Sequence, residues 1–256
     1  MEPLLNVENL SKYYRNIKAC NRVSFNLYPA QVLGIVGESG SGKSTLLNAI
    51  GGNIPIEGGN ITYTTSTGEV LTLPKLSETR RRLLMRNEWG FVQQNPRDGL
   101  RMNVTAGANI GERLMNIGVK NYGKIREEAA YWLSQVEIDT NRIDDLPKMF
   151  SGGMQQRLQL ARVLVTKPRL ILMDEPTGGL DVSVQARLLD LIRSLVRTLS
   201  LSVILVTHDL GVIRLLAHRL LVMKNGQIVE SGLTDQVLDD PQHSYTQKLV
   251  SSTLIP

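Results

Sequence analysis

Apolar runs of strand length alternate with helical stripes along most of the chain. Val32–Val36 is continuously apolar, as expected for a strand buried on both faces, and residues 170–173 and 203–206 repeat this pattern. One helical stripe lies between the last two runs, and we expect it to pack into the core; its positions are Val184, Leu188, Ile192, Leu195 and Leu199. Alternating units of this kind predict an α/β fold whose sheet is mostly parallel, with helices on both faces.

Two shorter patterns predict further strands. Residues 25–28 alternate between apolar and polar side chains, which is typical of a half-buried strand. Asn225 and Gly226 lie between strand-like stretches within residues 220–229. An Asn-Gly pair is a preferred turn of tight hairpins, so this segment is predicted to fold back on itself.

The middle of the chain interrupts the alternation. From about residue 75 to residue 145 it is polar, charged and mostly helical, and Ile125, Ala129, Trp132 and Val136 fall on one helix face. Pro147 is expected to mark the return of the chain to the core. We therefore predict one domain, with a core of residues 1–75 and 148–256 and an inserted helical subdomain at about residues 76–147.

Composition limits the classes of partner. The 256 residues carry a net charge of +5, which permits anionic partners without requiring them. The arginine-rich residues 80–86 are interpreted as a solvated helix face; an acidic partner protein is the alternative, and nucleic acid is disfavoured because no aromatic side chains interleave with the arginines. Cys20, the single cysteine, is interpreted as a small buried hydrophobe and fits a reducing cytoplasm. No apolar run is long enough for a membrane span.

Residues 37–44 match the phosphate-loop pattern G-x-x-x-x-G-K-[ST] in full, between a buried strand and a helix. Glycines let backbone N–H groups close around phosphate oxygens, and the helix start adds donors and a favourable dipole. Lys43 is expected to reach the β- and γ-phosphates of ATP, and the Ser44 hydroxyl to bind Mg²⁺. The predicted nucleotide-binding positions of this loop are Gly37, Ser39, Gly40, Ser41, Gly42, Lys43, Ser44 and Thr45.

Two carboxylates follow the apolar run at residues 170–173. A carboxylate at the C-terminal end of a parallel strand lies at the sheet edge where such folds bind their ligands. We expect Asp174 to hold Mg²⁺, mostly through water, and Glu175 to orient and polarise the attacking water. A solvated turn would explain the pair equally well in isolation, but the phosphate loop favours the catalytic interpretation.

Residues 150–157, Phe-Ser-Gly-Gly-Met-Gln-Gln-Arg, resemble the signature of ATP-binding-cassette (ABC) ATPases. In that family the signature serine and glycines, here including Ser151 and Gly153, open a helix whose N-terminus meets the γ-phosphate bound by the other subunit. The resemblance spans essentially the whole chain and implies MgATP hydrolysis by a two-subunit sandwich. It also implies a P-loop NTPase fold with a mostly parallel core sheet, an N-terminal antiparallel β subdomain and an inserted α-helical subdomain.

The same resemblance extends to an adenine contact and a sensor glutamine. Tyr14 matches the aromatic residue that stacks on adenine, with Tyr13 as the alternative. Gln94 matches the glutamine that senses Mg²⁺ and the attacking water and links hydrolysis to movement of the partner. Gln93, one position away, is the second choice.

Two further positions complete the family pattern. Asp181 matches the aspartate at the subunit interface, and His208 matches the histidine that contacts the γ-phosphate. Met154 stands where many signatures carry glutamine, but the peptide-transporter branch often has methionine there, so the site is not interpreted as inactive. The implied catalytic residues are Lys43, Gln94, Glu175 and His208, and the implied Mg²⁺ ligands are Ser44, Gln94 and Asp174.

Other segments resemble particular branches of the family. Residues 240–249 and 181–186 resemble the ATPases of oligopeptide and dipeptide importers, which dock on a membrane permease. The nucleotide-binding subunit of an oligopeptide/dipeptide- or phosphonate-type ABC importer is therefore one interpretation of the chain.

In the ABC family, the segment around the sensor glutamine and the helical subdomain form the surface that receives a partner. Four segments in this region favour a second interpretation. They resemble the PhnK-type ATP-binding subunits of the bacterial carbon–phosphorus (C–P) lyase system, and they are residues 88–90, 95–101, 107–115 and 141–147. We prefer this interpretation, which implies a cytoplasmic ATPase that pairs with a second ABC subunit, identical or related, and works with a soluble alkylphosphonate-degrading complex. A stand-alone ABC protein acting on nucleic acid or ribosomes is a third, disfavoured by the single cassette and the lack of long insertions.

Overall fold

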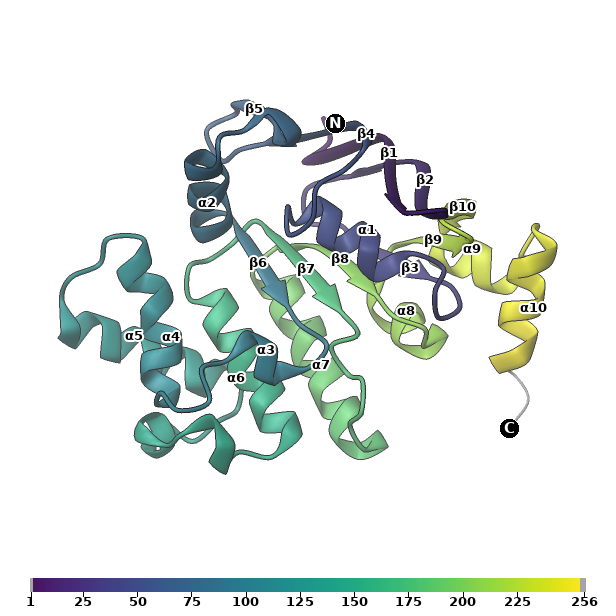
Figure 1. Ribbon diagram of the computed structural model, residues 1–256. Helices are drawn as coiled ribbons and strands as arrows, with labels where there is room; N and C mark the ends of the chain where they lie inside the picture. The colour runs from purple at the N-terminus through teal and green to yellow at the C-terminus, as the bar shows by residue number, and fades with distance from the viewer. Residues whose placement is uncertain (1, 254–256) are drawn as a thin grey trace. The chain divides into compact units, whose positions relative to one another are not determined.

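The computed structural model describes residues 2–253, and Figure 1 shows them as a ribbon. The contacts within the chain divide it into two compact units. Among the described residues, the first unit comprises residues 2–81 and 195–253, and the second comprises residues 82–194. The helices α2 (Glu78–Asn87) and α7 (Val182–Thr198) each continue across a boundary between the units. The helical subdomain expected at about residues 76–147 stays a prediction.

The first unit begins with an antiparallel sheet of strand order β2-β1-β4-β5. Its strands are β1 (Leu5–Tyr14), β2 (Ile17–Leu27), β4 (Gly58–Thr64) and β5 (Val70–Thr72), followed by the 3-10 helix η1 (Leu73–Lys75). β1 is central because it pairs with both β2 and β4. The predicted strand at residues 25–28 is the end of β2, where Leu27 is buried and Asn26 is exposed. The expected antiparallel β subdomain is therefore confirmed.

The same unit contains the strand order β10-β9-β3-β8. The strands are β3 (Val32–Val36), β8 (Ser202–Val206), β9 (Arg219–Lys224) and β10 (Gln227–Leu233), and the helices are α1 (Lys43–Ile50), α8 (Leu210–Leu216), α9 (Thr234–Asp239) and α10 (Ser244–Thr253). β3 pairs in parallel with β8 and β9, and all residues of β3 and β8 are buried, as their apolar runs predict. Asn225 (φ 49°) and Gly226 (φ 76°) form the predicted turn of the β9–β10 hairpin.

The second unit combines a parallel strand pair with helices. β6 (Trp89–Val92) pairs with β7 (Leu170–Asp174), and the helices are α3 (Pro96–Gly99), α4 (Ala106–Asn116), α5 (Tyr122–Gln135) and α6 (Gly152–Leu164), with the 3-10 helices η2 (Thr140–Asp144) and η3 (Pro147–Met149). β6 lies within the segment expected to be mostly helical and was not predicted. Four residues are too few for a strand period to stand out, and the strand forms because β7 supplies its hydrogen-bonding partner.

The apolar face predicted for α5 is buried. Ile125, Ala129, Trp132 and Val136 retain 7%, 1%, 1% and 0% of their surface exposure. These positions place one side of the helix in the core of the second unit, as the helical spacing predicts.

The stripe predicted along α7 is shorter than expected. Leu188, Ile192 and Leu195 are buried, but Val184 is only half-buried and Leu199 is 37% exposed. The expectation that all of them pack into the core is wrong at Leu199, because the helix ends at Thr198 and the next residue leaves the helical face.

A buried asparagine fixes the loop that precedes α4. The Asn109 side chain is fully buried, and its Nδ2 donates to the carbonyl oxygens of Arg101, Val104 and Thr105 at 3.1, 2.9 and 3.0 Å. Its Oδ1 accepts the N–H of Arg101 at 2.8 Å. Because a buried amide is stable only when its donors and acceptor are satisfied, this network holds residues 101–105 in one conformation.

The surface of α2 agrees with an expectation from composition. In α2 the arginines at positions 80, 82 and 86 are exposed, Leu84 is buried, and Arg80 pairs with Glu69 at 2.7 Å, which fits a solvated helix face. Among the described residues, no helix combines the length and the apolar character needed to cross a membrane.

Cys20 is buried, as interpreted from the sequence, and this predicts its reactivity. Burial raises the pKa of the Cys20 thiol to about 12. The thiolate is the nucleophile, and an unfolded cysteine has a pKa of about 8.5. We therefore expect native protein at pH 8 to resist iodoacetamide, while protein unfolded in urea is alkylated within minutes, as followed by intact mass. Equal alkylation rates in the two states would contradict this burial.

Candidate nucleotide-binding site

The phosphate loop joins β3 to α1 and encloses a lysine. Lys43 Nζ donates to the carbonyl oxygens of Gly37 at 2.8 Å and Glu38 at 3.0 Å, and the side chain is only 6% exposed. A buried ammonium needs such oxygens because it has lost its water shell. Ser39 is exposed on the same loop, and Ser44 is exposed in the first turn of α1. The loop therefore holds a buried positive charge beneath an open polar surface.

Glycines give the loop its shape. Gly37, Gly40 and Gly42 have φ values of 153°, 81° and 104°, a range that favours glycine. A Cβ on Gly37 would lie 2.2 Å from the Met223 carbonyl oxygen, and one on Gly42 would lie 2.0 Å from the Ala19 carbonyl oxygen. Gly37 and Gly42 are therefore required by space as well as by conformation, whereas Gly40 is required by conformation alone.

The start of α1 is suited to an anion. The Gly42 carbonyl accepts the N–H of Leu46 at 2.8 Å, and among the described residues no side chain caps the helix. The early N–H groups of a helix carry a partial positive charge, which favours a phosphate there. Ser44 is exposed and Thr45 is half-buried in this first turn, and Ser41 is buried at the end of the loop.

His208 lies at the same edge of the sheet as the phosphate loop. It follows β8, which runs parallel to β3, and the N–H of the preceding Thr207 donates to the Ile35 carbonyl oxygen at 3.2 Å. The neighbouring Asp209 caps α8, since its carboxylate accepts the N–H of Gly211 at 2.8 Å. The His208 side chain is exposed. The first unit thus brings together two elements predicted to contact the γ-phosphate.

Both candidate adenine contacts lie at the end of the β1–β2 hairpin in this unit. Tyr14 is 46% exposed and Tyr13 is 38% exposed, so each ring has a surface that a base could cover. Lys12 Nζ lies 5.1 Å from the centroid of the Tyr14 ring. The choice between the two tyrosines stays open.

The second unit carries the acidic pair and the sensor glutamine. Asp174 ends β7 and is 7% exposed, whereas Glu175 is half-buried with a φ of 42°. A left-handed conformation costs a non-glycine residue about 1–2 kcal/mol, and strain of this kind is concentrated at functional sites. The backbone therefore holds Glu175 in a left-handed conformation, which Asn225 also adopts in the β9–β10 turn.

Gln94 and Glu175 converge on one glycine. A Cβ on Gly178 would lie 3.7 Å from the Gln94 amide nitrogen and 3.7 Å from Glu175 Cβ. Their strands, β6 and β7, run in parallel, so both residues emerge at the same sheet edge. The structure thus brings the predicted sensor close to the residue predicted to polarise water.

The signature opens α6 in the same unit. Ser151 caps the helix, and its Oγ accepts the N–H of Met154 at 3.4 Å. Ser151 and Gly152 are exposed, whereas Gly153 is buried, and a Cβ there would lie 2.4 Å from Val184 Cγ1. The helix start therefore presents a serine and open backbone to solvent while its next residue packs closely on α7.

Met154 and Asp181 have defined surroundings. Arg142 Nη1 lies 3.5 Å from Met154 Sδ, and the same guanidinium lies 4.3 Å from the centre of the Phe150 ring. Asp181 is exposed directly before α7, and its carbonyl accepts the N–H of Gln185 at 2.8 Å. Met154 is thus packed against other side chains of the signature region. Asp181, in contrast, lies on a surface where another molecule could contact it.

Sequence reasoning missed a pair of buried glutamines on α6. Gln159, fully buried, accepts the N–H of Gln93 at 2.7 Å, donates to the Gln93 carbonyl at 3.2 Å, and donates to Gln156 Oε1 at 2.8 Å. Gln156 Nε2 in turn donates to the Gln94 carbonyl at 2.9 Å. The signature helix therefore holds the backbone of the segment that carries the sensor glutamine. Gln156 and Gln159 are three residues apart on a helix that also carries buried leucines. This spacing places them on one side of the helix and was the sequence signal that they could be buried together.

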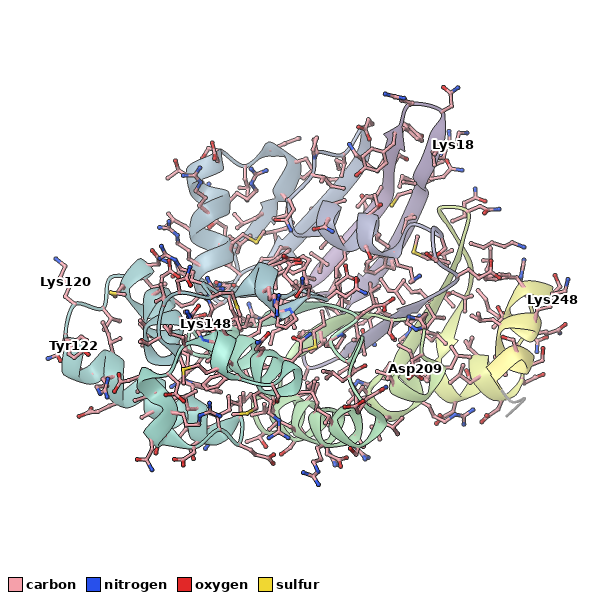
Figure 2. The ribbon with its side chains drawn as sticks, turned by 60° about the horizontal axis from the view of Figure 1, so that its bottom comes forward. Lys18, Lys120, Tyr122, Lys148, Asp209 and Lys248 are labelled. Carbon is pink, nitrogen blue, oxygen red and sulfur yellow. The ribbon has the colours of Figure 1, made fainter. Side chains whose placement is uncertain are left out.

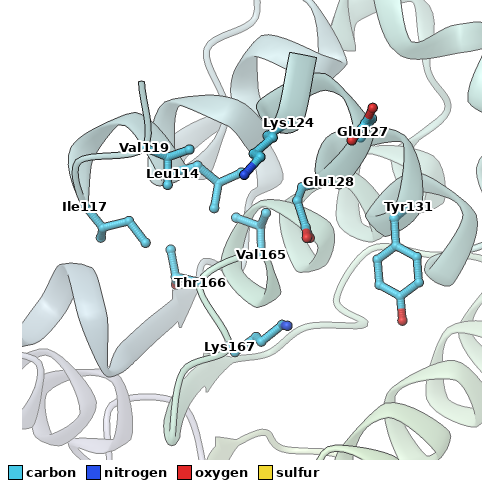
Figure 3. A pocket seen from close by; sticks show the side chains of 10 residues that line it. All are labelled: Leu114, Ile117, Val119, Lys124, Glu127, Glu128, Tyr131, Val165, Thr166 and Lys167. Atoms are coloured by element: carbon cyan, nitrogen blue, oxygen red, sulfur yellow. The ribbon is translucent and has the colours of Figure 1, made fainter. Parts of the chain in front are cut away.

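A hollow of about 690 Å³ lies elsewhere in the second unit (Figure 3). Leu114, Ile117 and Val165 form part of its apolar lining, and Lys124 and Glu128 are among its charged residues. None of the residues predicted to bind nucleotide is among its described lining residues. It therefore adds nothing to the nucleotide site.

The family can now be identified. The sequence profile of the family described as ABC transporter matches residues 20–178, which is more than half of the chain. This chain belongs to the ABC transporter family. It is an ABC-type ATPase that binds adenine nucleotide, as its phosphate loop and signature predict, and the roles assigned to individual residues stay predictions.

Curated ABC proteins resemble the whole chain. The ATP-binding protein PhnK of Escherichia coli (strain K12), named for phosphonates utilization, is 63% identical over 99% of this chain and 98% of its own length. The dipeptide transport ATP-binding protein DppD of Bacillus subtilis (strain 168) is 36% identical over 98% of this chain and 77% of its own length. The resemblance to PhnK-type subunits is therefore confirmed.

Solved ABC cassettes share the fold. A dimeric structure of the cassette MJ0796 in a post-hydrolysis state, bound to ADP and Pi, has a TM-score of 0.79 and 28% identity over 90% of this chain and 98% of its own. The structure of cbiO1 from Clostridium perfringens has a TM-score of 0.80 and 25% identity over 99% of this chain and 96% of its own. The predicted fold class is confirmed.

The glutamine network of this ABC protein predicts a large effect on stability. Gln159→Leu keeps the side-chain volume but leaves Gln156 Oε1 and the N–H and carbonyl of the half-buried Gln93 without this partner. Each unsatisfied group costs about 1–3 kcal/mol, so we expect the free energy of unfolding in urea to fall by about 2–4 kcal/mol. Gln135→Leu, at an exposed position of α5, is the matched control. It should change the free energy of unfolding by less than about 0.5 kcal/mol. Equal effects of the two substitutions would contradict the network.

Proposed function

We propose that this ABC protein is the MgATP-hydrolysing subunit of a phosphonate-utilization system and couples its ATPase cycle to the C–P lyase complex in alkylphosphonate breakdown. The observation that supports this most strongly is the 63% identity to the E. coli relative, which extends over nearly the full length of both chains. The dipeptide transport relative is less similar, at 36% identity, and this chain spans only 77% of it. An oligopeptide- or dipeptide-type importer is the second candidate, favoured by residues 240–249.

Hydrolysis in this proposal rests on positioning and charge. Phosphoryl transfer to water needs a fixed nucleophile and stabilised phosphate charge more than covalent chemistry. Lys43 and the loop N–H groups would bind the β- and γ-phosphates, and His208 would contact the γ-phosphate. Glu175 would orient and polarise the water, with Gln94 beside it. A tyrosine of the β1–β2 hairpin would stack on adenine.

The donor set suits magnesium. Ser44 offers a hydroxyl, Gln94 an amide oxygen and Asp174 a carboxylate, and Mg²⁺ prefers such oxygen ligands. When bound, the ion would supply positive charge that offsets the negative charge of the phosphates. Ser44 is exposed at the start of α1, and Asp174 ends a buried strand, so each donor lies where a loop or strand opens to a ligand.

The proposed working state is a two-subunit sandwich. The signature serine and Asp181 are exposed, and a helix start with open N–H groups would complete the phosphate shell of the other subunit. ATP would then close the dimer, and hydrolysis with phosphate release would reopen it. The dimeric state of the MJ0796 cassette bound to ADP and Pi supports this proposal. The second subunit is either another copy or a related ABC protein.

The proposed docking surface for the partner follows the sensor glutamine. Asn95 caps α3 by accepting the N–H of Arg97 at 3.1 Å, and Arg97 is exposed. Arg101 is 63% exposed and pairs with Glu112 at 3.0 Å, while Asn109 fixes its backbone. These two exposed guanidinium groups lie on a backbone that is held in place, and in this proposal they contact acidic groups of the partner. A soluble partner complex implies a cytoplasmic location.

Affinity purification tests this function. Tagged Glu175→Gln protein, prepared with MgATP from cells grown on a phosphonate, is expected to carry soluble phosphonate-cleaving subunits with it, identified by mass spectrometry. The substitution should slow hydrolysis and so prolong the ATP-bound state. Recovery with a membrane permease alone would contradict the lyase proposal, and recovery lost on nuclease treatment would indicate a nucleic-acid complex instead.

Charge reversal localises the contact. Arg97→Glu and Arg101→Glu should reduce recovery of the partner several-fold without changing ATP binding, because both lie on the proposed docking surface. Arg193→Glu, at an exposed position of α7, is the matched control and should leave recovery unchanged. Equal recovery with all three variants would exclude this surface as the docking site.

A further inference from the structure

The C-terminal helix α10 contacts the phosphate loop through one side chain. The Tyr245 hydroxyl oxygen accepts the N–H of Glu38 at 3.0 Å, and Tyr245 is only 5% exposed. The Glu38 carbonyl accepts Lys43 Nζ at 3.0 Å and the N–H of Ser41 at 3.1 Å. The peptide group before Glu38 is therefore held by Tyr245, and the peptide group after it supports the lysine of the loop.

Tyr245 is itself firmly placed by the residues before it. The Glu230 carboxylate, on β10, accepts the N–H groups of Gln242 at 2.8 Å and His243 at 3.0 Å. His243 Nδ1 accepts the N–H of Tyr245 at 3.0 Å. These bonds fix the start of α10 against the hairpin, so the hydroxyl is delivered to Glu38 at a defined position.

One side of α10 is packed and another faces solvent. Tyr245 and Thr246 are buried, whereas Gln247 and Lys248 are exposed, and Figure 2 labels Lys248 on this helix. Lys224 Nζ, from β9, lies 4.6 Å from the centre of the Tyr245 ring. The ring is thus enclosed by its own unit, with its hydroxyl directed to the phosphate loop.

The β9–β10 hairpin supports the other end of the loop. The N–H of Gly226 donates to the Ser41 carbonyl at 2.9 Å, and the Gly226 carbonyl accepts the N–H of Asn21 at 2.8 Å. Segments that follow β8 in the sequence therefore hold the loop at two separated points, Glu38 and Ser41.

We propose that Tyr245 is a positioning residue of the nucleotide site, and that the tail segment (residues 240–249) sets the phosphate loop in its ATP-binding shape. A loop that is already shaped loses less conformational freedom when phosphate binds, so ATP binds more tightly. Without the hydroxyl, the peptide before Glu38 is freer to rotate, and the carbonyl after it supports Lys43 less well. The inference rests on the proposed role of the phosphate loop in ATP binding and is independent of the lyase proposal.

Removing only the hydroxyl tests the inference. In the full chain, Tyr245→Phe keeps the ring and its packing, and we expect the Kd for a fluorescent ATP analogue and the KM for ATP to rise about threefold to tenfold, the effect of one hydrogen bond. The kcat should stay within about twofold of wild type, because the groups predicted to act on water are unchanged. Tyr131→Phe, whose tyrosine is 54% exposed on α5, is the matched control and should change neither constant.

Two further variants make the result decisive. Glu230→Gln keeps Tyr245 but weakens the anchor of the tail segment, so the Kd for the ATP analogue should rise in the same direction by a smaller factor. Lys43→Ala should abolish binding; if it binds as wild type does, the proposed role of the phosphate loop fails. An unchanged Kd and KM in Tyr245→Phe, whether or not its melting temperature falls, would overturn the positioning role.

Discussion

The nucleotide site depends on the hydrogen bonds between the buried Lys43 ammonium and the carbonyl oxygens of Gly37 and Glu38. An ammonium that has left water is stable only where oxygens replace its hydration shell. The loop must therefore curl so that these carbonyls point inward, and this curl requires the positive φ values of Gly37 and Gly42. A phosphate would then meet a charge that is already placed, together with the start of α1.

In the second unit, neutral side chains hold a functional segment in place by hydrogen bonds. The glutamine side chains of α6 hydrogen-bond the backbone at Gln93 and Gln94, so the sensor segment and the signature helix form one buried polar network. A displacement of that segment must either move α6 or break buried hydrogen bonds, each of which is costly to lose. In the proposed function, a partner that contacts residues 95–101 would act on the signature through this network.

Local patterns predicted much of the fold, because strands such as Val32–Val36 and the turn at Asn225 are encoded by a few neighbouring residues. The phosphate loop was found for the same reason. β6 was missed because a strand of four residues depends on its pairing with β7, and Leu199 was misplaced because periodicity does not define where a helix ends.

The contacts that shape the site join residues far apart in the sequence, so short sequence patterns could not predict them. Gln159 meets Gln93 across 66 positions, and Tyr245 meets Glu38 across 207 positions. Polar residues on a helix are ordinarily interpreted as surface, and only tertiary packing shows that these are buried. The sequence could therefore name the residues of the loop but not the side chains that hold it.

In the proposed function, the chain is half of an ATP-closed sandwich in which Glu175 acts on the water. The most direct test is the molar mass of Glu175→Gln protein by light scattering, with and without MgATP. We expect a stable dimer with MgATP, a monomer without nucleotide, and hydrolysis reduced by orders of magnitude. A variant that stays monomeric with MgATP and hydrolyses it at the wild-type rate would contradict both the sandwich and the role of Glu175.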